Sequence, residues 1–301
     1  MINFYSASSV FLPFISFLKT NWTRFPNSTE PNRKENHHYD PPKNTLYQLI
    51  IWDFGDTLNR LREGALAEGA AEIEQELGCH VNAGMLREAI RQEWRKRSDE
   101  SSLNIIKSID TIEKEDDYYR EFYLCVAGTF SDKLPGKTLL DSLVRMQVNP
   151  ESYELMPGAK DVLEKLKEKG IRQAILSNGF VSARKQIKHL KIDHYFDCIM
   201  VSCEEHAAKP DQALYQRLLD FCKINTPQET LFIDDRREFI EGAAQMKMDT
   251  LWFQPQNINE NGSIKERISN LSEVFDKVVA KEQEHDRSFQ PHCSSSRRAY
   301  S

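Results

Sequence analysis

Long hydrophobic runs are scarce in this sequence of 301 residues. The first 44 residues contain an apolar stretch, residues 10–18, but Pro13 interrupts it and it is too short to span a bilayer. No basic segment precedes it, which argues against a secretory signal. Frequent serines and the lack of acidic residues before Glu30 resemble an organelle transit peptide, but basic residues are sparse. We therefore expect residues 1–44 to be a disordered extension of a cytoplasmic protein, with organelle targeting as the alternative.

Paired cysteines and clustered histidines are also missing. None of the six cysteines belongs to a C-x-x-C pair, and a chain of this length does not depend on a disulfide framework. Reduced thiols fit a cytosolic protein. The adjacent His37 and His38 lie in a polar stretch rich in Pro and Asn, which favours no metal site there. The cysteines are Cys79, Cys125, Cys198, Cys203, Cys222 and Cys293.

A surplus of basic residues is absent too, because the net charge is -6 at pH 7. This balance argues against general affinity for nucleic acid, which usually needs a basic face. The apolar fraction of 40% is enough to build a packed core. We expect neither nucleic acid nor a membrane as a partner, and the oligomeric state stays open.

Short apolar runs rich in β-forming residues alternate with helical patterns in the second half of the chain. Helical spacing at residues 159–169, closed by Gly170, and at residues 214–221 separates the later runs. Alternation of this kind predicts an α/β fold with a Rossmann-like parallel sheet covered on both faces. Strands are expected at residues 46–52, 171–176, 198–202, 231–233 and 250–253.

Residues 62–148 break this alternation and read as wholly helical. Four helices are expected, the first closed by Gly78 and the others at residues 85–97, 116–129 and 138–146. The predicted organisation is an α/β core (45–61 plus 149–281), an inserted helical cap (62–148) and a disordered tail (282–301). The basic triplet Arg95-Lys96-Arg97 suits an anionic substrate, but a solvated helix end is the interpretation we favour.

Polar residues stand at or just after the predicted strands. Asp53 follows the first strand, Ser177 the second, and the pair Asp234-Asp235 follows the fourth, while Lys209 lies past the third. The carboxyl ends of parallel strands line one crevice, so these side chains are expected to converge.

Such a convergence indicates phosphoryl chemistry. Three carboxylates repel one another unless a cation lies among them, and their hard oxygens suit Mg²⁺. A lysine and a serine hydroxyl beside that ion can hold the oxygens of a phosphoryl group, and Asp53 can attack as a carboxylate nucleophile. Positioning and charge neutralisation then supply most of the catalysis.

These residues resemble the four motifs of the haloacid dehalogenase-like hydrolase superfamily, in order and at the usual intervals, over about residues 46–280. The helical insert is similar to the cap of the phosphoglycolate phosphatase and haloacid dehalogenase branch. The matching stretches are Asp53 to Thr57, Met156 to Ala159, Leu163 to Gly170, Ser177 to Gly179, Tyr195 to Asp197, Lys209 to Asp211, Asp234-Asp235 and Gly242-Ala243.

The resemblance implies a role for each matched residue. It makes Asp53 the nucleophile and a metal ligand, and it gives Asp235, with Asp234 beside it, to the metal. The backbone carbonyl of Gly55 takes the second metal position of the first motif. Phosphate binding is assigned to Ser177, Asn178, Gly179 and Lys209, and Lys209 also steadies the nucleophile.

Two positions depart from the family pattern. The usual first motif is D-x-D-G-T, whose second Asp is the general acid/base, and here that position is Gly55. Asp56, one residue later, is the candidate substitute, and simple turn chemistry is its alternative role. Phe239 stands where a further Asp or Asn usually follows the acidic pair, and the adjacent Glu238 is a candidate replacement.

The expected function is a Mg²⁺-dependent phosphatase of a small phosphorylated metabolite, acting through an aspartyl-phosphate. Gly55 motivates an alternative, a catalytically impaired member that binds or regulates. A C–halogen hydrolase is disfavoured because the acidic pair is present, whereas a phosphonatase, which needs a cap lysine, stays open. Trp52 and Trp252 are expected in the core rather than in the site.

Overall fold

A six-stranded parallel sheet forms the centre of the computed structural model, which describes residues 45–97, 99–255 and 266–288. The strand order is β5-β4-β1-β6-β7-β8, so the α/β fold class predicted from the sequence is confirmed. The five predicted strands are present, and β8 is an addition of two residues. The strands are β1 (Leu49–Trp52), β4 (Arg172–Ser177), β5 (Cys198–Val201), β6 (Thr230–Asp234), β7 (Asp249–Phe253) and β8 (Arg267–Ile268).

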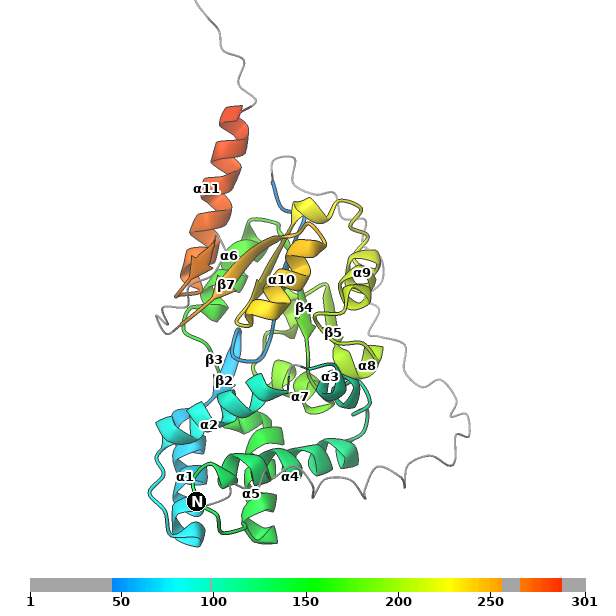
Figure 1. The fold of residues 1–301 in the computed structure, drawn as a ribbon. Helices are drawn as coiled ribbons and strands as arrows, with labels where there is room; N and C mark the ends of the chain where they lie inside the picture. The colour runs from blue at the N-terminus through cyan, green and yellow to red at the C-terminus, as the bar shows by residue number, and fades with distance from the viewer. Residues whose placement is uncertain (1–44, 98, 256–265, 289–301) are drawn as a thin grey trace, which may run out of the picture. The chain divides into compact units, whose positions relative to one another are not determined.

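Helices cover both faces of this sheet (Figure 1). Along β1, Ile50 and Trp52 belong to the apolar cluster that includes α6 (Ala159–Glu168) and α11 (Ser272–Ser288). Leu49 and Ile51 belong to the opposite cluster, with α9 (Gln212–Phe221) and α10 (Arg237–Gln245). This alternation follows from the two-residue period of a strand, and it buries both faces of β1. The remaining core helices are α7 (Ser182–His189), α8 (Ser202–Glu205), η2 (Pro150–Ser152), η3 (Asp193–Tyr195) and η4 (Pro227–Glu229).

The helical insert has its own apolar core and contains five helices in the described residues, where the sequence predicted four. The additional helix, α3, has seven residues and is capped at its N-terminus by Asp99, whose side chain accepts a hydrogen bond from Ser102 N. Gly78 ends the first helix with φ 72°, as predicted, because glycine tolerates this left-handed conformation. The helices are α1 (Glu63–Leu77), α2 (Ala83–Lys96), α3 (Glu100–Ile106), α4 (Ile112–Gly128) and α5 (Lys137–Val148).

A short antiparallel strand pair connects the insert to the sheet-bearing part of the chain. β2 (Asn59–Leu61) enters the insert and β3 (Tyr153–Leu155) leaves it, and the two are paired. The hydrogen bond from Arg62 N to Ser152 O, 2.8 Å long, joins the two ends of the insert. The sequence did not predict this pair, because three-residue strands carry almost no periodicity.

The predicted tail begins too early at residue 282. α11 continues to Ser288, and ion pairs of 2.8 Å join Lys169 to Glu282 and Lys281 to Asp249. These ion pairs attach the polar start of the predicted tail to the rest of the protein, which its composition alone did not indicate. The predictions for residues 1–44 and 289–301 lie outside the described residues. Among the helices described, none is both long and apolar enough to cross a membrane.

Candidate active site

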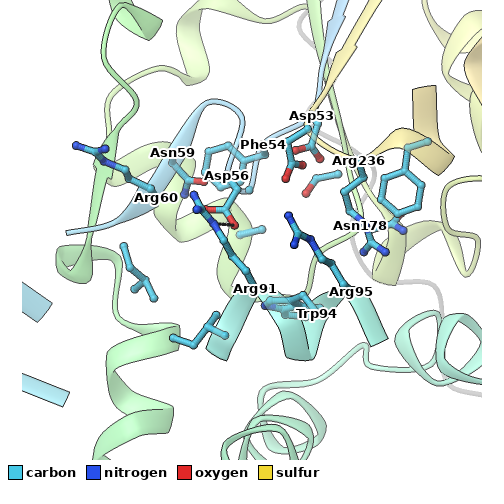
Figure 2. A pocket seen from close by; sticks show the side chains of 18 of the residues that line it. Asp53, Phe54, Asp56, Asn59, Arg60, Arg91, Trp94, Arg95, Asn178 and Arg236 are labelled. Atoms are coloured by element: carbon cyan, nitrogen blue, oxygen red, sulfur yellow. Dashed lines mark ion pairs between the residues drawn. The ribbon is translucent and has the colours of Figure 1, made fainter. Parts of the chain in front are cut away.

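A cavity of about 650 Å³ lies at the carboxyl ends of β1, β4 and β6. Asp53, Ser177 and Asp235 line it from the sheet side, and residues of α2 line it from the helical insert. Figure 2 shows side chains from both parts turned toward the same space. The predicted convergence of the strand ends is therefore present, and the insert contributes the opposite wall.

Lys209 links two of the predicted carboxylates. Its side chain has no exposed surface, and Nζ lies 2.7 Å from Asp53 Oδ1 and 2.7 Å from Asp234 Oδ2. Burial alone would lower the pKa of Lys209, but Asp234 and Asp53 raise it above its ordinary value. This raised pKa favours the charged ammonium beside Asp53.

Asn178 holds the loop that carries Lys209. Its amide nitrogen donates to Lys209 O at 2.9 Å, and its amide oxygen accepts from Lys209 N at 2.8 Å. Both amide atoms of the Asn178 side chain therefore already have protein partners, and phosphate binding by the backbone N–H groups near Asn178 stays a prediction.

Gly179, for which phosphate binding stays a prediction, is hydrogen-bonded within the protein. Its N–H donates to Ser202 Oγ at 3.1 Å, so that donor is occupied. A Cβ at this position would lie 3.2 Å from Ser177 Oγ, so glycine leaves room for the Ser177 hydroxyl. Ser177 itself is buried and lines the cavity, in keeping with its predicted place.

An acidic cluster faces the cavity. Carboxylate oxygens of Asp53, Asp234 and Asp235 all lie within 4.8 Å of one another. Asp234 is already engaged, because it accepts hydrogen bonds from Lys209 Nζ and from Arg236 N at 2.8 Å. Its pKa is raised by burial, which the nearby Lys209 opposes.

Asp235 is the more open member of this cluster. Its backbone oxygen accepts from Trp252 Nε1 at 2.9 Å, which fixes the main chain and leaves the carboxylate toward the cavity. Burial, followed by repulsion from Asp234 and Asp53, raises the pKa of Asp235 well above its ordinary value. A cation would relieve this repulsion, so the donor set fits Mg²⁺, with Asp53, Asp235 and the Gly55 carbonyl as its protein ligands.

Asp56 lines the cavity, but on the side toward the insert (Figure 2). Its φ of 58° is left-handed, a conformation that Asp tolerates better than most residues. Its Oδ2 lies 3.9 Å from Arg91 Nε. Removal from bulk water raises the pKa of Asp56, while Arg91 opposes this rise.

The basic triplet at the end of α2 lies partly at the cavity. Arg95 is exposed, in line with the solvated helix end that the sequence favoured, but it also lines the cavity and, in Figure 2, extends from α2 toward Asp53. Lys96 is exposed, and Arg97 pairs with Glu93 at 2.8 Å. The signal was available in the sequence, since Arg87, Arg91 and Arg95 recur every four residues on one helix face.

Phe239 and Glu238 clarify the second departure from the family pattern. The Phe239 ring is buried, with Lys209 Nζ 4.9 Å and Arg236 Cζ 4.6 Å from its centroid, so it supplies cation–π contacts and no ligand oxygen. Glu238 lines the cavity but forms an ion pair with Arg236, and it lies outside the acidic cluster. Trp252 is buried as predicted, yet it also lines the cavity.

Comparison with known proteins agrees with this geometry. A sequence model of the haloacid dehalogenase-like hydrolases matches residues 47–247, and the chain belongs to this family of hydrolases. It is 24% identical over 195 residues to haloacid dehalogenase-like hydrolase domain-containing protein 3 of Xenopus laevis, covering 62% of this chain and 76% of that protein.

Two further relatives show how the likeness is distributed. A glyceraldehyde 3-phosphate phosphatase of Pyrococcus abyssi is 34% identical over 100 residues, or 33% of this chain and 42% of that protein. The L-2-haloacid dehalogenase structure from Xanthobacter autotrophicus aligns with a TM-score of 0.58 at 16% identity, covering 77% of this chain and 98% of that one. The structural likeness concerns the fold, and the relatives include both phosphatases and dehalogenases.

Proposed function

We propose that this hydrolase is a Mg²⁺-dependent phosphatase that acts on a small phosphorylated metabolite. The observation that carries the proposal is the buried Lys209 ammonium, 2.7 Å from Asp53, beneath an acidic cluster that suits a cation. The likeness to a glyceraldehyde 3-phosphate phosphatase, limited to 100 residues, supports the reaction class.

The proposed reaction has two steps at Asp53. A carboxylate oxygen of Asp53 forms a bond to phosphorus while the bond from phosphorus to the ester oxygen breaks, and the departing oxygen takes up a proton. Water then attacks phosphorus, breaks the bond to Asp53, and releases phosphate with the carboxylate restored. Lys209 neutralises the charge beside Asp53, and the Ser177 hydroxyl donates to a phosphoryl oxygen.

The metal would be held by Asp53, Asp235 and the Gly55 carbonyl, and when bound it would supply positive charge to the phosphoryl oxygens. Asp234 serves Lys209 rather than the metal, because both its oxygens already accept hydrogen bonds. These different roles agree with the burial of the two residues, because Asp234 beside Lys209 is buried and Asp235 at the cavity is less so.

Proton transfer to the leaving group is proposed for Asp56, since Gly55 cannot supply it. Asp56 lines the cavity directly after the first metal-binding segment. Its contact with Arg91 favours a competing role, in which Asp56 only holds α2 against the sheet. General acid–base help contributes about 10²- to 10⁴-fold in rate, so the two roles differ measurably.

A second candidate is a member with impaired chemistry that binds a phosphorylated ligand without turning it over. Gly55 in place of the usual acid/base aspartate favours it. The phosphonatase reading loses support, because no lysine of the described insert lines the cavity.

Phosphate release by purified protein tests the proposal. We expect release from a panel of phosphorylated metabolites that requires Mg²⁺ and stops with a chelator. Asp53→Asn should lower the rate by about three orders of magnitude or more, as loss of a nucleophile does. Asp161→Asn, an exposed change on α6, is the matched control and should be near wild type. A folded protein that binds Mg²⁺ but releases no phosphate would favour the impaired member.

A further inference from the structure

One face of α2 lines the cavity with arginines. Arg87, Arg91 and Arg95 are spaced by four residues and all line it. Arg87 already has a carboxylate partner, because its Nη2 lies 2.8 Å from Glu63 Oε2. The guanidinium groups of Arg91 and Arg95 are turned toward the sheet side of the site, as Figure 2 shows.

The Arg91 guanidinium has no close hydrogen-bond acceptor among the residues that the structure describes. Its side chain is 19% exposed, and its ion pair with Asp56 spans 3.9 Å, too long for a hydrogen bond. Within the described part of the chain no hydrogen bond is formed by this guanidinium, which carries five donors. A mostly buried guanidinium of this kind is suited to a bidentate contact with a carboxylate or phosphate.

Asn59 is a second and independent indication. It is 1% exposed, and neither its amide oxygen nor its amide nitrogen has a hydrogen-bond partner. It lines the cavity beside Asp56 (Figure 2). Buried amides are almost always paired, so an unpaired one on a cavity wall indicates a ligand that supplies the partner.

We propose that Arg91, Arg95 and Asn59 form a second anion subsite, and that the substrate is a small phosphomonoester with a second anionic group, a carboxylate or another phosphate. The proposal rests on the proposed function, which places the reacting phosphoryl group at Asp53. The second anion would accept hydrogen bonds from the Arg91 guanidinium, which lies 3.9 Å from Asp56 Oδ2. It would also accept a hydrogen bond from the Asn59 amide nitrogen.

The rest of the cavity limits the size of this substrate. Trp94 and Phe180 line it, with ring centroids 6.2 Å apart. A cavity of about 650 Å³ shared by two charged subsites and aromatic rings suits a short carbon skeleton between the two anions.

A matched substrate series tests the subsite. Propyl phosphate, 3-phosphonooxypropanoate and propane-1,3-diyl bisphosphate share a three-carbon chain and differ in the far group. We expect kcat/KM at least about tenfold higher for the two anionic compounds, since charge-assisted hydrogen bonds are the strong ones. The comparison between the carboxylate and the bisphosphate identifies which anion the subsite takes.

Variants on α2 then test which residues cause the preference for the anionic substrates. Arg91→Gln and Arg95→Gln should each lower the ratio of anionic to neutral kcat/KM toward one, whereas Lys96→Gln, which removes the same charge from an exposed position, should keep it. Arg91→Lys should restore part of the ratio. If Arg91 acted only through Asp56, all three substrates would lose activity equally, and the subsite would be refuted.

Failure of the subsite is separable from failure of the phosphatase. Turnover of all three compounds with equal kcat/KM would overturn the subsite and leave the phosphatase intact. If none is turned over, calorimetric binding to Asp53→Asn decides: tighter binding of the anionic compounds, lost on adding Arg95→Gln, supports the subsite, and equal or absent binding overturns it.

Discussion

Lys209 is a fully buried charge whose ammonium lies between Asp53 and Asp234. Such a group persists in a core only because its partners compensate for the water it has lost, and removing one partner typically costs about 3–5 kcal/mol. The same contact restrains Asp53, so the stability of the fold and the position of the proposed nucleophile both depend on it.

Asp56 gives a prediction at the residue scale. As a general acid it would matter for an alkyl leaving group, which needs a proton, and much less for nitrophenolate, which does not. We expect Asp56→Asn to lower kcat for alkyl phosphates by about 10²-fold or more and for nitrophenyl phosphate by less than about tenfold.

Steady-state kinetics with both ester classes checks this, with Arg91→Gln as the comparison. An equal, small loss for both leaving groups, reproduced by Arg91→Gln, would assign Asp56 to holding α2 instead.

The sequence predicted the residues whose position follows from strand order. Asp53, Ser177 and Asp234 come at strand ends, where parallel topology brings them together. It could not predict the hydrogen bonds of the segment after Ser177, because the Asn178 side chain and the Gly179 N–H find their partners across the fold, in Lys209 and Ser202. These partners are distant in sequence, and no local pattern encodes them.

At the scale of elements, a buried carboxyl joins the insert to the sheet-bearing part. Glu115 of α4 accepts from Ser182 N at 3.0 Å and from Ser182 Oγ, at the start of α7. Burial raises the pKa of Glu115 above 4.5, although the Ser182 bonds oppose this. The contribution of this contact to the free energy of unfolding therefore depends on pH.

The linkage between proton binding and folding gives the direction of this pH dependence. A raised pKa means that the folded state binds more protons, so this contribution to stability is complete below pH 4.5 and declines as pH rises through the folded pKa. Glu115→Gln stays neutral and keeps an acceptor for Ser182 N. We expect it to match wild type in acid and to exceed it increasingly at higher pH.

Urea unfolding from pH 4.5 to 8 measures the difference in free energy of unfolding. Glu121→Gln, exposed on the same helix, should give a small difference that does not change with pH. A Glu115→Gln protein that becomes less stable than wild type at pH 8 would show that the fold favours the carboxylate form and lowers the pKa of Glu115.

Long elements were predictable and short ones were not. The helices α1, α2, α4 and α5 show an apolar face at helical spacing, which a reader of the sequence can detect. The pair β2–β3 and the helix α3 are held by tertiary contacts and caps rather than by periodicity. Similarly, the end of α11 depends on the ion pair between Lys169 and Glu282, distant in sequence.

At the scale of the whole molecule, a cation bound by the acidic cluster would couple metal binding to stability. Mg²⁺ that binds only the folded state should raise the free energy of unfolding, by about 2.7 kcal/mol at a hundredfold excess over Kd. We expect Asp235→Asn to abolish this gain and, without metal, to melt higher than wild type because carboxylate repulsion is relieved.

Thermal unfolding followed by circular dichroism, with Mg²⁺ and with chelator, checks both expectations. Asp161→Asn should keep the wild-type response. An equal rise in Tm for wild type and Asp235→Asn would place the metal elsewhere.

The strand pair β2–β3 has an evolutionary consequence. Because the two ends of the insert meet at the hydrogen bond between Arg62 and Ser152, the chain leaves the sheet-bearing part and re-enters it at one place. The insert is a helical unit that lies between two paired strands, outside the central sheet. Selection can therefore change the residues with which the insert lines the cavity and leave the strand ends that carry Asp53 and Asp235 as they are.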